Sequence, residues 1–97
     1  MSHALDGRER RRNLLFLATP RLWPAWPFLP LVRRAGAEEE CGLLVDLLGL
    51  CGLAGYSATV FLCNLFCLPA GVDGLLALPK EAYDTPEEVL AAGWRVD

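Results

Sequence analysis

Histidine is nearly absent from this chain, and its scarcity excludes most familiar catalytic sites. The single histidine, His3, stands in a polar segment near the N-terminus. Nucleophiles that rely on histidine, histidine metal sites and the usual general base are therefore not expected. The glycine-rich residues 49–52 also lack the lysine and hydroxyl of a phosphate-binding loop. We predict a chain that is not an enzyme and has no catalytic residue, metal or cofactor.

Charged side chains are missing from residues 47–72, although 22% of all residues are charged. As one helix this run is long enough to cross a bilayer, because about 20 apolar residues suffice. The excess of arginine before it would then keep the N-terminus cytoplasmic. As two pieces it is a glycine-rich turn over residues 47–55 and a buried strand over residues 56–66. A single-span membrane protein, as an accessory subunit of a larger complex, is therefore one alternative.

Composition favours the second structure for this run. Glycine at every third position of residues 49–55 is typical of a loop. Residues 56–66 are rich in aromatic and β-branched side chains, which favour a strand. Asn64 would also leave its amide unpaired in lipid. We predict that residues 47–72 are not one helix and that residues 56–66 form a long central strand covered on both faces.

The spacing of the four cysteines matches no zinc site. Nine, eleven and three residues separate Cys41, Cys51, Cys63 and Cys67, whereas structural zinc sites use closely spaced pairs. All four stand among apolar neighbours, so we expect reduced cysteines that pack as small hydrophobic side chains in the core. Nothing in the sequence indicates a secretory context for disulfides, which predicts a reducing compartment and a cytoplasmic location.

The net charge of −3 conceals an uneven distribution. Residues 1–34 carry seven arginines and two acids, a net +5, while residues 35–97 carry two basic residues and ten acids, a net −8. We expect residues 1–12 to be a mobile basic arm. Its candidate anion-binding residues are Arg8, Arg10, Arg11 and Arg12. They suit the phosphates of lipid or nucleic acid, but no base-stacking motif accompanies them, so nucleic acid is the less favoured partner.

A short apolar run over residues 13–18 follows this arm. It is shorter than the roughly 7–15 residues of a signal-peptide core, because it ends at Thr19 and Pro20. We expect it to be the first strand of a single small domain that covers residues 13–97. A chain of this length can bury a modest core.

Proline recurs at every third position of residues 23–30, among aromatic side chains. Because proline fixes φ and restrains the residue before it, this proline-rich segment is expected to be extended, and neither helical nor a central strand. As a polyproline helix it would be a ligand for an aromatic groove. Alternatively, it packs its rings on its own core or in a self-association interface. The candidate partner-binding residues are Trp23, Pro24, Trp26, Pro27, Phe28 and Pro30.

Residues 35–37 are expected to form a turn between a basic and an acidic segment. Arg33 and Arg34 precede this turn, and three glutamates follow it. If the turn closes a hairpin with a second strand over residues 38–45, the opposite charges face each other across two strands. Such pairs contribute a fraction of a kcal/mol each, so a structural role explains them.

The clearest local pattern predicts a short helix near residue 86. Thr85 is the expected N-cap, Pro86 occupies the first helical position, and Glu88 completes a capping box. Gly93 is expected to end the helix in the left-handed conformation. Trp94 would then fold back on the helix, and residues 95–97 would add a last short strand.

These patterns together predict an α+β fold with a small antiparallel sheet of three to four strands and one short C-terminal helix. The expected function is that of a non-catalytic binding or structural protein that acts through protein–protein contacts. Its partner would be an unidentified protein or a second copy of the chain. The alternatives are the single-span membrane protein, and binding to an anionic surface through the arginine-rich N-terminus.

Overall fold

The computed structural model describes residues 6–97, which form one antiparallel five-stranded sheet in the order β4-β3-β2-β1-β5. The strands are β1 (Phe28–Ala35), β2 (Glu38–Val45), β3 (Thr59–Phe61), β4 (Lys80–Ala82) and β5 (Arg95–Val96). The helices are α1 (Gly7–Ala18), α2 (Leu47–Cys51), α3 (Gly71–Leu76) and α4 (Pro86–Ala91), with 3₁₀ turns η1 (Pro20–Leu22) and η2 (Leu65–Cys67). The predicted α+β class is confirmed, although the sheet has more strands than expected and several helices accompany it.

The β1–β2 hairpin is the longest paired unit of the sheet. Each β1 residue faces one β2 residue, and Gly36 takes a φ of 65° in the turn between them. The register sets Arg33 against Glu40 and Arg34 against Glu39. The predicted turn and the acidic second strand are therefore confirmed.

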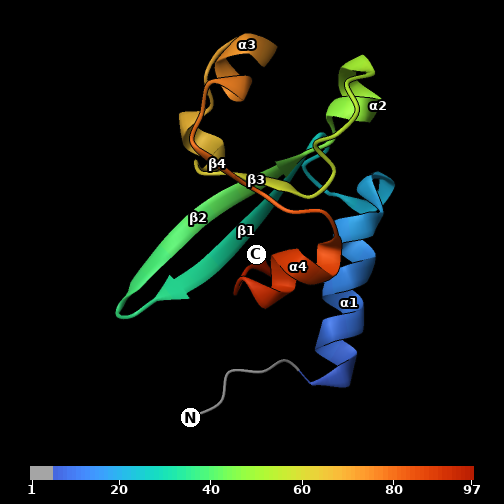
Figure 1. Ribbon diagram of the computed structural model, residues 1–97, viewed down its shortest axis with the longest axis vertical. Helices are drawn as coiled ribbons and strands as arrows, with labels where there is room; N and C mark the ends of the chain where they lie inside the picture. The colour runs from blue at the N-terminus through green and yellow to red at the C-terminus, as the bar shows by residue number, and fades with distance from the viewer. Residues whose placement is uncertain (1–5) are drawn as a thin grey trace.

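The outer half of this hairpin has no strand beside it. β5 pairs with β1 at Leu31 and Val32, and β3 pairs with β2 at Leu43. Closer to the turn, no described strand flanks either edge. The hairpin tip therefore projects from the rest of the molecule (Figure 1).

Pro30 lies inside β1, between β2 and β5, so the prediction that its segment avoids a central strand was wrong. The Pro30 carbonyl accepts a hydrogen bond from the Asp97 nitrogen at 3.0 Å. In an antiparallel strand the nitrogen and carbonyl of one residue point to the same side. The missing N–H of Pro30 therefore faces away from β2, and the pairing with β2 loses no hydrogen bond.

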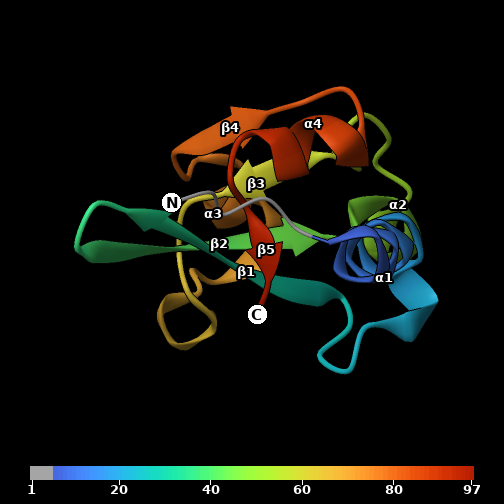
Figure 2. The same ribbon diagram turned by 90° about the horizontal axis from the view of Figure 1, so that it is seen from below.

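Both faces of the sheet are covered, as the apolar composition of residues 56–66 predicted, and helices cover each of them. On one face Leu31, Leu44 and Val60 pack with residues of α1 and α4, which lie beside each other. On the other face Phe61 packs with Leu75 of α3 and with the start of α2. Figure 1 shows α3 and α4 on opposite sides of the sheet, and Figure 2 shows the same layers from below.

Residues 13–18, expected to be a strand, form the second half of α1. The helix begins after Asp6, whose carboxylate accepts a hydrogen bond from the Glu9 nitrogen at 2.8 Å. Arginine and leucine are good helix formers, and the apolar side chains Leu14 and Leu17 are spaced to reach the sheet from one helix face. Residues 7–12 of the expected basic arm also belong to this helix, while residues 1–5 lie outside the described residues.

Residues 47–72 are not one helix, as predicted, but the long strand over residues 56–66 was wrong. Only three residues, β3, pair with neighbouring strands. Asp46 caps α2 through the Gly49 nitrogen, and Asn64 caps η2 in the same manner. These caps satisfy local N–H groups and so favour short helical turns over a longer strand. No helix within residues 6–97 is both long and apolar enough to cross a bilayer.

The predicted C-terminal helix, its Thr85 N-cap and the left-handed Gly93 that follows are confirmed, whereas Glu88 accepts from the nitrogen of Asp84 instead of that of Thr85, so the capping box is not formed as predicted. The Thr85 hydroxyl accepts a hydrogen bond from the Glu88 nitrogen at 3.2 Å, and the Glu88 carboxylate accepts one from the Asp84 nitrogen at 3.3 Å. Gly93 takes a φ of 97° immediately after the helix. Trp94 is fully buried in the same cluster as the helix residues. The following residues form β5, as expected.

Candidate functional site

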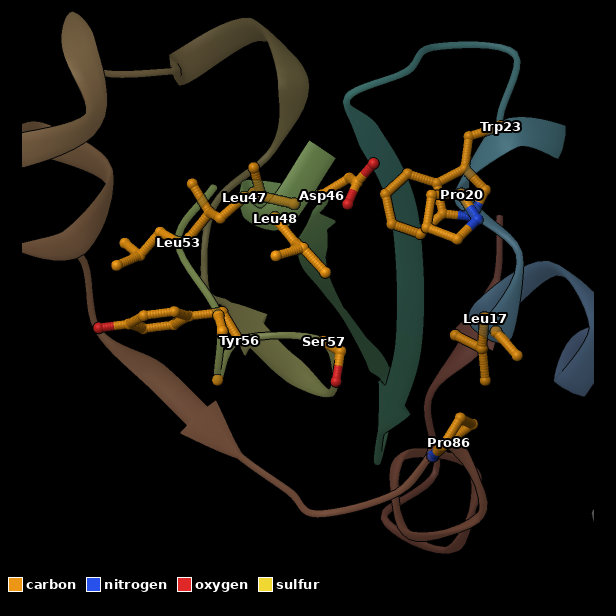
Figure 3. Close-up of a pocket in the computed structure, with 14 residues that line it drawn as sticks. Leu17, Pro20, Trp23, Asp46, Leu47, Leu48, Leu53, Tyr56, Ser57 and Pro86 are labelled. Carbon is orange, nitrogen blue, oxygen red and sulfur yellow. The ribbon is translucent and has the colours of Figure 1, made fainter. Parts of the chain in front are cut away.

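A pocket of about 410 Å³ opens where α1, η1 and α2 meet. In Figure 3 the side chains of Leu17 and Trp23 stand on one side of it, those of Leu48 and Leu53 stand on the other, and Pro86 lies at its lower end. Its lining is mostly apolar, with Asp46, Tyr56 and Ser57 as its polar members. A hollow with this composition accepts apolar groups and leaves a few positions for hydrogen bonds.

Asp46 connects the two sides of the pocket. One carboxylate oxygen accepts a hydrogen bond from the Gly49 nitrogen at 3.1 Å, and the other accepts one from the indole of Trp26 at 2.8 Å. Its backbone nitrogen donates to the Pro27 carbonyl at 2.8 Å. Asp46 is the one charged residue that lines the pocket, and both donors to its carboxylate are neutral. Its negative charge is therefore available to an incoming cation.

Trp23 forms a fixed wall of the pocket. Its indole N–H donates a hydrogen bond to the Phe16 carbonyl at 2.6 Å, near the C-terminal end of α1. The side chain is buried and packs with Leu17 in the main core cluster. Buried tryptophan usually needs such a partner for its N–H, so this bond holds η1 and the residues after it against α1.

Large apolar side chains are exposed on the segments that line this pocket. Six such side chains are exposed among residues 6–97, and five belong to α1, α2 and the segment that begins with η1. The five are Leu15, Leu22, Trp26, Leu48 and Leu50. The same three segments contribute lining residues to the pocket. We call the pocket with these five side chains the apolar face. The sixth exposed side chain, Phe66, lies in η2.

The structure separates the six candidate partner-binding residues. Trp23 is buried, Trp26 and Pro24 are exposed, and the remaining three are half-buried. Residues 23–27 form turns, because the Trp26 nitrogen donates to the Trp23 carbonyl at 3.2 Å and the Phe28 nitrogen donates to the Ala25 carbonyl at 2.9 Å. The prediction of an extended segment was therefore wrong before Phe28 and right from Phe28 onward. A polyproline helix is not formed, because turns interrupt the segment.

The four candidate anion-binding residues all lie on α1 and are exposed. The list is Arg8, Arg10, Arg11 and Arg12. None forms a salt bridge with a residue in the described part of the chain. Arg12 lies over the Phe16 ring with its guanidinium carbon 6.0 Å from the ring centroid. Anion binding by this group stays a prediction.

The expectation that the cysteines pack in the core was wrong. Cys41, Cys51 and Cys67 are exposed, and Cys63 is half-buried. Cys41 lies in β2 opposite Val32, Cys51 is the last residue of α2, and Cys63 and Cys67 lie just before and at the end of η2. Burial, and to a smaller extent the nearby Cys67 side chain, raises the pKa of Cys63, which makes it a weak nucleophile at neutral pH. No metal-binding group of three His, Cys, Asp or Glu occurs within residues 6–97.

A polar network on the sheet surrounds Glu81. Arg33 donates to both oxygens of Glu81 at 2.8 Å and also pairs with Glu40 at 3.0 Å. Tyr83 and Trp94 donate to one Glu81 oxygen at 2.5 Å and 3.2 Å. The hydrogen bonds from Arg33, then those from Tyr83, lower the pKa of Glu81 to about 2, and the two glutamates raise the pKa of Arg33.

This network has a structural role. The Arg33 guanidinium lies 4.3 Å from the ring centre of Trp94, so β1, β4 and the C-terminal segment share one cluster of charge-assisted hydrogen bonds. No buried side-chain nitrogen or oxygen within residues 6–97 lacks a partner. Every polar group of the network is already engaged, which leaves the apolar face as the candidate site.

Sequence reasoning missed the pocket, because its walls come from residues far apart in the chain. The sequence predicts a turn over residues 47–55, which include Leu48, and nothing in it marks Asp46 as part of a site. Leu48 lies in α2, a helix of five residues that buries Leu47 against the core. A helix this short cannot bury both of its sides, so Leu48 remains exposed. Comparison with known proteins adds no assignment: no protein-family model matches the chain, and no curated protein or solved structure matches it significantly.

Proposed function

We propose that the chain is a non-catalytic protein-binding module and that its partner docks on the apolar face. The observation that carries this proposal is the concentration of exposed apolar side chains on the segments that line one pocket. Five of the six within residues 6–97 belong to segments that line it, and Leu48, at 64% exposure, lines the pocket itself. Apolar groups gathered in this way, with a polar group among them, are typical of interaction surfaces.

The size of the hollow favours a protein partner. A pocket of about 410 Å³ lies near the lower limit for a small-molecule site and takes one or two side chains of a partner. A stable interface buries about 800 Å² on each partner, so the flanking residues Leu15, Leu22 and Leu50 are also needed. Their exposure is explained if a partner covers them.

The charge of the site specifies the chemistry of the partner. Asp46 has neutral hydrogen-bond donors and no cationic neighbour in the pocket lining. Two exposed charged residues directly follow lining residues, Glu87 after Pro86 and Arg21 after Pro20, so Asp46 gives the site its net negative charge. A partner segment that carries apolar side chains next to lysine or arginine therefore complements this surface.

Selection of random peptides on the immobilised protein tests this function. We expect the bound sequences to combine a large apolar side chain with an adjacent lysine or arginine, and their addition to shift the NMR signals of α2 and residues 53–57. Leu48→Glu should abolish this binding, because it places a charge in the pocket. Asp46→Asn should keep apolar binding but remove the preference for basic residues.

Phe66→Glu is the matched control. Phe66 is the most exposed large apolar side chain described, at 97%, and does not line the pocket. The same substitution there should leave peptide binding unchanged. Equal loss of binding in both glutamate variants, or selected peptides without an apolar residue, would overturn the proposal.

A further inference from the structure

The exposed side of α1 carries basic and apolar side chains, the combination that the apolar face is proposed to bind. Arg8, Arg11, Arg12 and Leu15 are spaced by three, four and seven positions, which places them on one stripe of the helix. All four are exposed, and Leu15 is 55% exposed. The three arginines form no salt bridge with any residue in the described range. This basic stripe with one leucine is a segment of the kind proposed above.

The stripe and the pocket are neighbours on one side of the molecule. Leu15 and Ala18 are three residues apart on α1 and so are adjacent on the helix surface. Ala18 lines the pocket. A two-fold symmetric contact needs two complementary patches that lie next to each other on each copy. Each copy can then bind the basic stripe of the other with its pocket and offer its own stripe in return.

We propose that the partner on the apolar face is a second copy of this chain, and that the two copies exchange α1 stripes across a two-fold axis. This inference rests on the proposed function and names its partner. Leu15 of each copy enters the apolar face of the other beside Leu48. Arg11 and Arg12 of each copy approach Asp46 and Glu87 of the other.

Charge complementarity supports this choice of partner. The chain carries a net +5 in residues 1–34 and a net −8 in residues 35–97. Within residues 6–97 of one copy the α1 arginines form no salt bridge, although acidic residues are plentiful elsewhere. Facing copies bring the basic stripe of one to Asp46 and Glu87 of the other, twice in each dimer. The electrostatic attraction therefore acts at both ends of the contact.

Sedimentation equilibrium over about 10 µM to 1 mM protein measures this association. The full chain is expected to show a reversible monomer–dimer equilibrium. Leu15→Glu replaces the apolar anchor with a charge that faces Asp46, and should raise the dissociation constant about tenfold or more. Arg11→Glu should also weaken the dimer, and raised salt should weaken the wild-type dimer, because salt screens its charge pairs.

Two control variants carry the same changes at exposed positions outside the contact. Phe66→Glu matches Leu15→Glu, and Arg34→Glu, at the hairpin tip, matches Arg11→Glu. Both should dimerise like the wild type. All four positions are exposed, so circular dichroism should show unchanged folding in each variant. A monomer at every concentration, higher oligomers without a closed dimer, or equal weakening by the controls would overturn the proposal.

The two proposals fail in different ways. A chain that remains monomeric but still selects apolar and basic peptides, with loss of binding in Leu48→Glu, refutes self-association and supports the binding function. A dimer that Leu15→Glu dissociates, but that Leu48→Glu and Asp46→Asn leave intact, refutes the exchange of α1 onto the apolar face.

Discussion

Gly42 is the position where one added methyl group tests the packing of this sheet most directly. A Cβ at Gly42 would lie 2.5 Å from Cγ1 of Val60 and 3.0 Å from two ring carbons of Trp94. Val60 and Trp94 are both fully buried. Val60 is β-branched and stiff about χ1, and Trp94 is held by its hydrogen bond to Glu81. Neither side chain can move aside without displacing others.

Two effects of Gly42→Ala on the free energy of unfolding have opposite signs. Loss of the backbone freedom of glycine in a strand favours alanine by about 0.5–1 kcal/mol. Overpacking a filled core costs about 1–3 kcal/mol. Carbon atoms are attractive only near about 3.5–4.0 Å, so the closer contacts at Gly42 make the second effect dominate. We expect a net loss of about 1–2 kcal/mol, or roughly 4–16 °C in Tm for a domain of this size.

A double-mutant cycle in urea separates packing from backbone effects. The four proteins are the wild type, Gly42→Ala, Val60→Ala and the double variant. Val60→Ala removes the atom nearest to the new methyl group, so Gly42→Ala should cost less in that background. A stabilising Gly42→Ala, or the same cost in both backgrounds at equal urea slope, would refute the packing argument.

Three further outcomes follow from other contacts. Thr85→Ala should lower the free energy of unfolding by about 1 kcal/mol, because the Glu88 nitrogen loses its side-chain acceptor, and equal urea midpoints would contradict this. The pKa of Glu81 is lowered to about 2 from its ordinary 4.5, so its contribution to stability is complete above pH 4.5 and is lost as pH falls toward 2. Glu81→Gln should therefore lose less stability than the wild type over that pH range, and an equal loss in both proteins would contradict this. Phe66→Glu should change the free energy of unfolding by less than about 0.5 kcal/mol, measured by the same urea titration.

The sequence predicted those elements correctly whose structure is determined within one short segment. The Thr85 cap, Pro86 and Gly93 predict α4 because each acts within a few residues. The hairpin turn at Gly36 is predictable for the same reason. The α+β class follows from these elements and from the apolar content of β3.

Tertiary contacts decided the elements that the sequence did not predict. Residues 13–18 are apolar enough for a strand, but α1 places Leu17 against the sheet while its arginines face solvent. Residues 56–66 have strand composition, yet β4 pairs with three of them only. The pocket combines Leu17, Asp46 and Pro86, and no spacing along the chain reveals that these residues meet.

The projecting hairpin restricts how this chain can aggregate. Its outer half leaves the N–H and C=O groups on both edges without a partner strand, which is a common starting point for edge-to-edge assembly. If the β1 edges of two molecules paired, Arg34 of one would lie near Arg34 of the other. If the β2 edges paired, the two Glu39 side chains would lie near each other. The remaining combination, β1 against β2, sets arginine against glutamate and is not opposed by charge, but it is unsymmetrical and would continue from copy to copy. The charges at the tip therefore oppose the two symmetric edge pairings, while an open fibre is limited by the short length of the exposed edge.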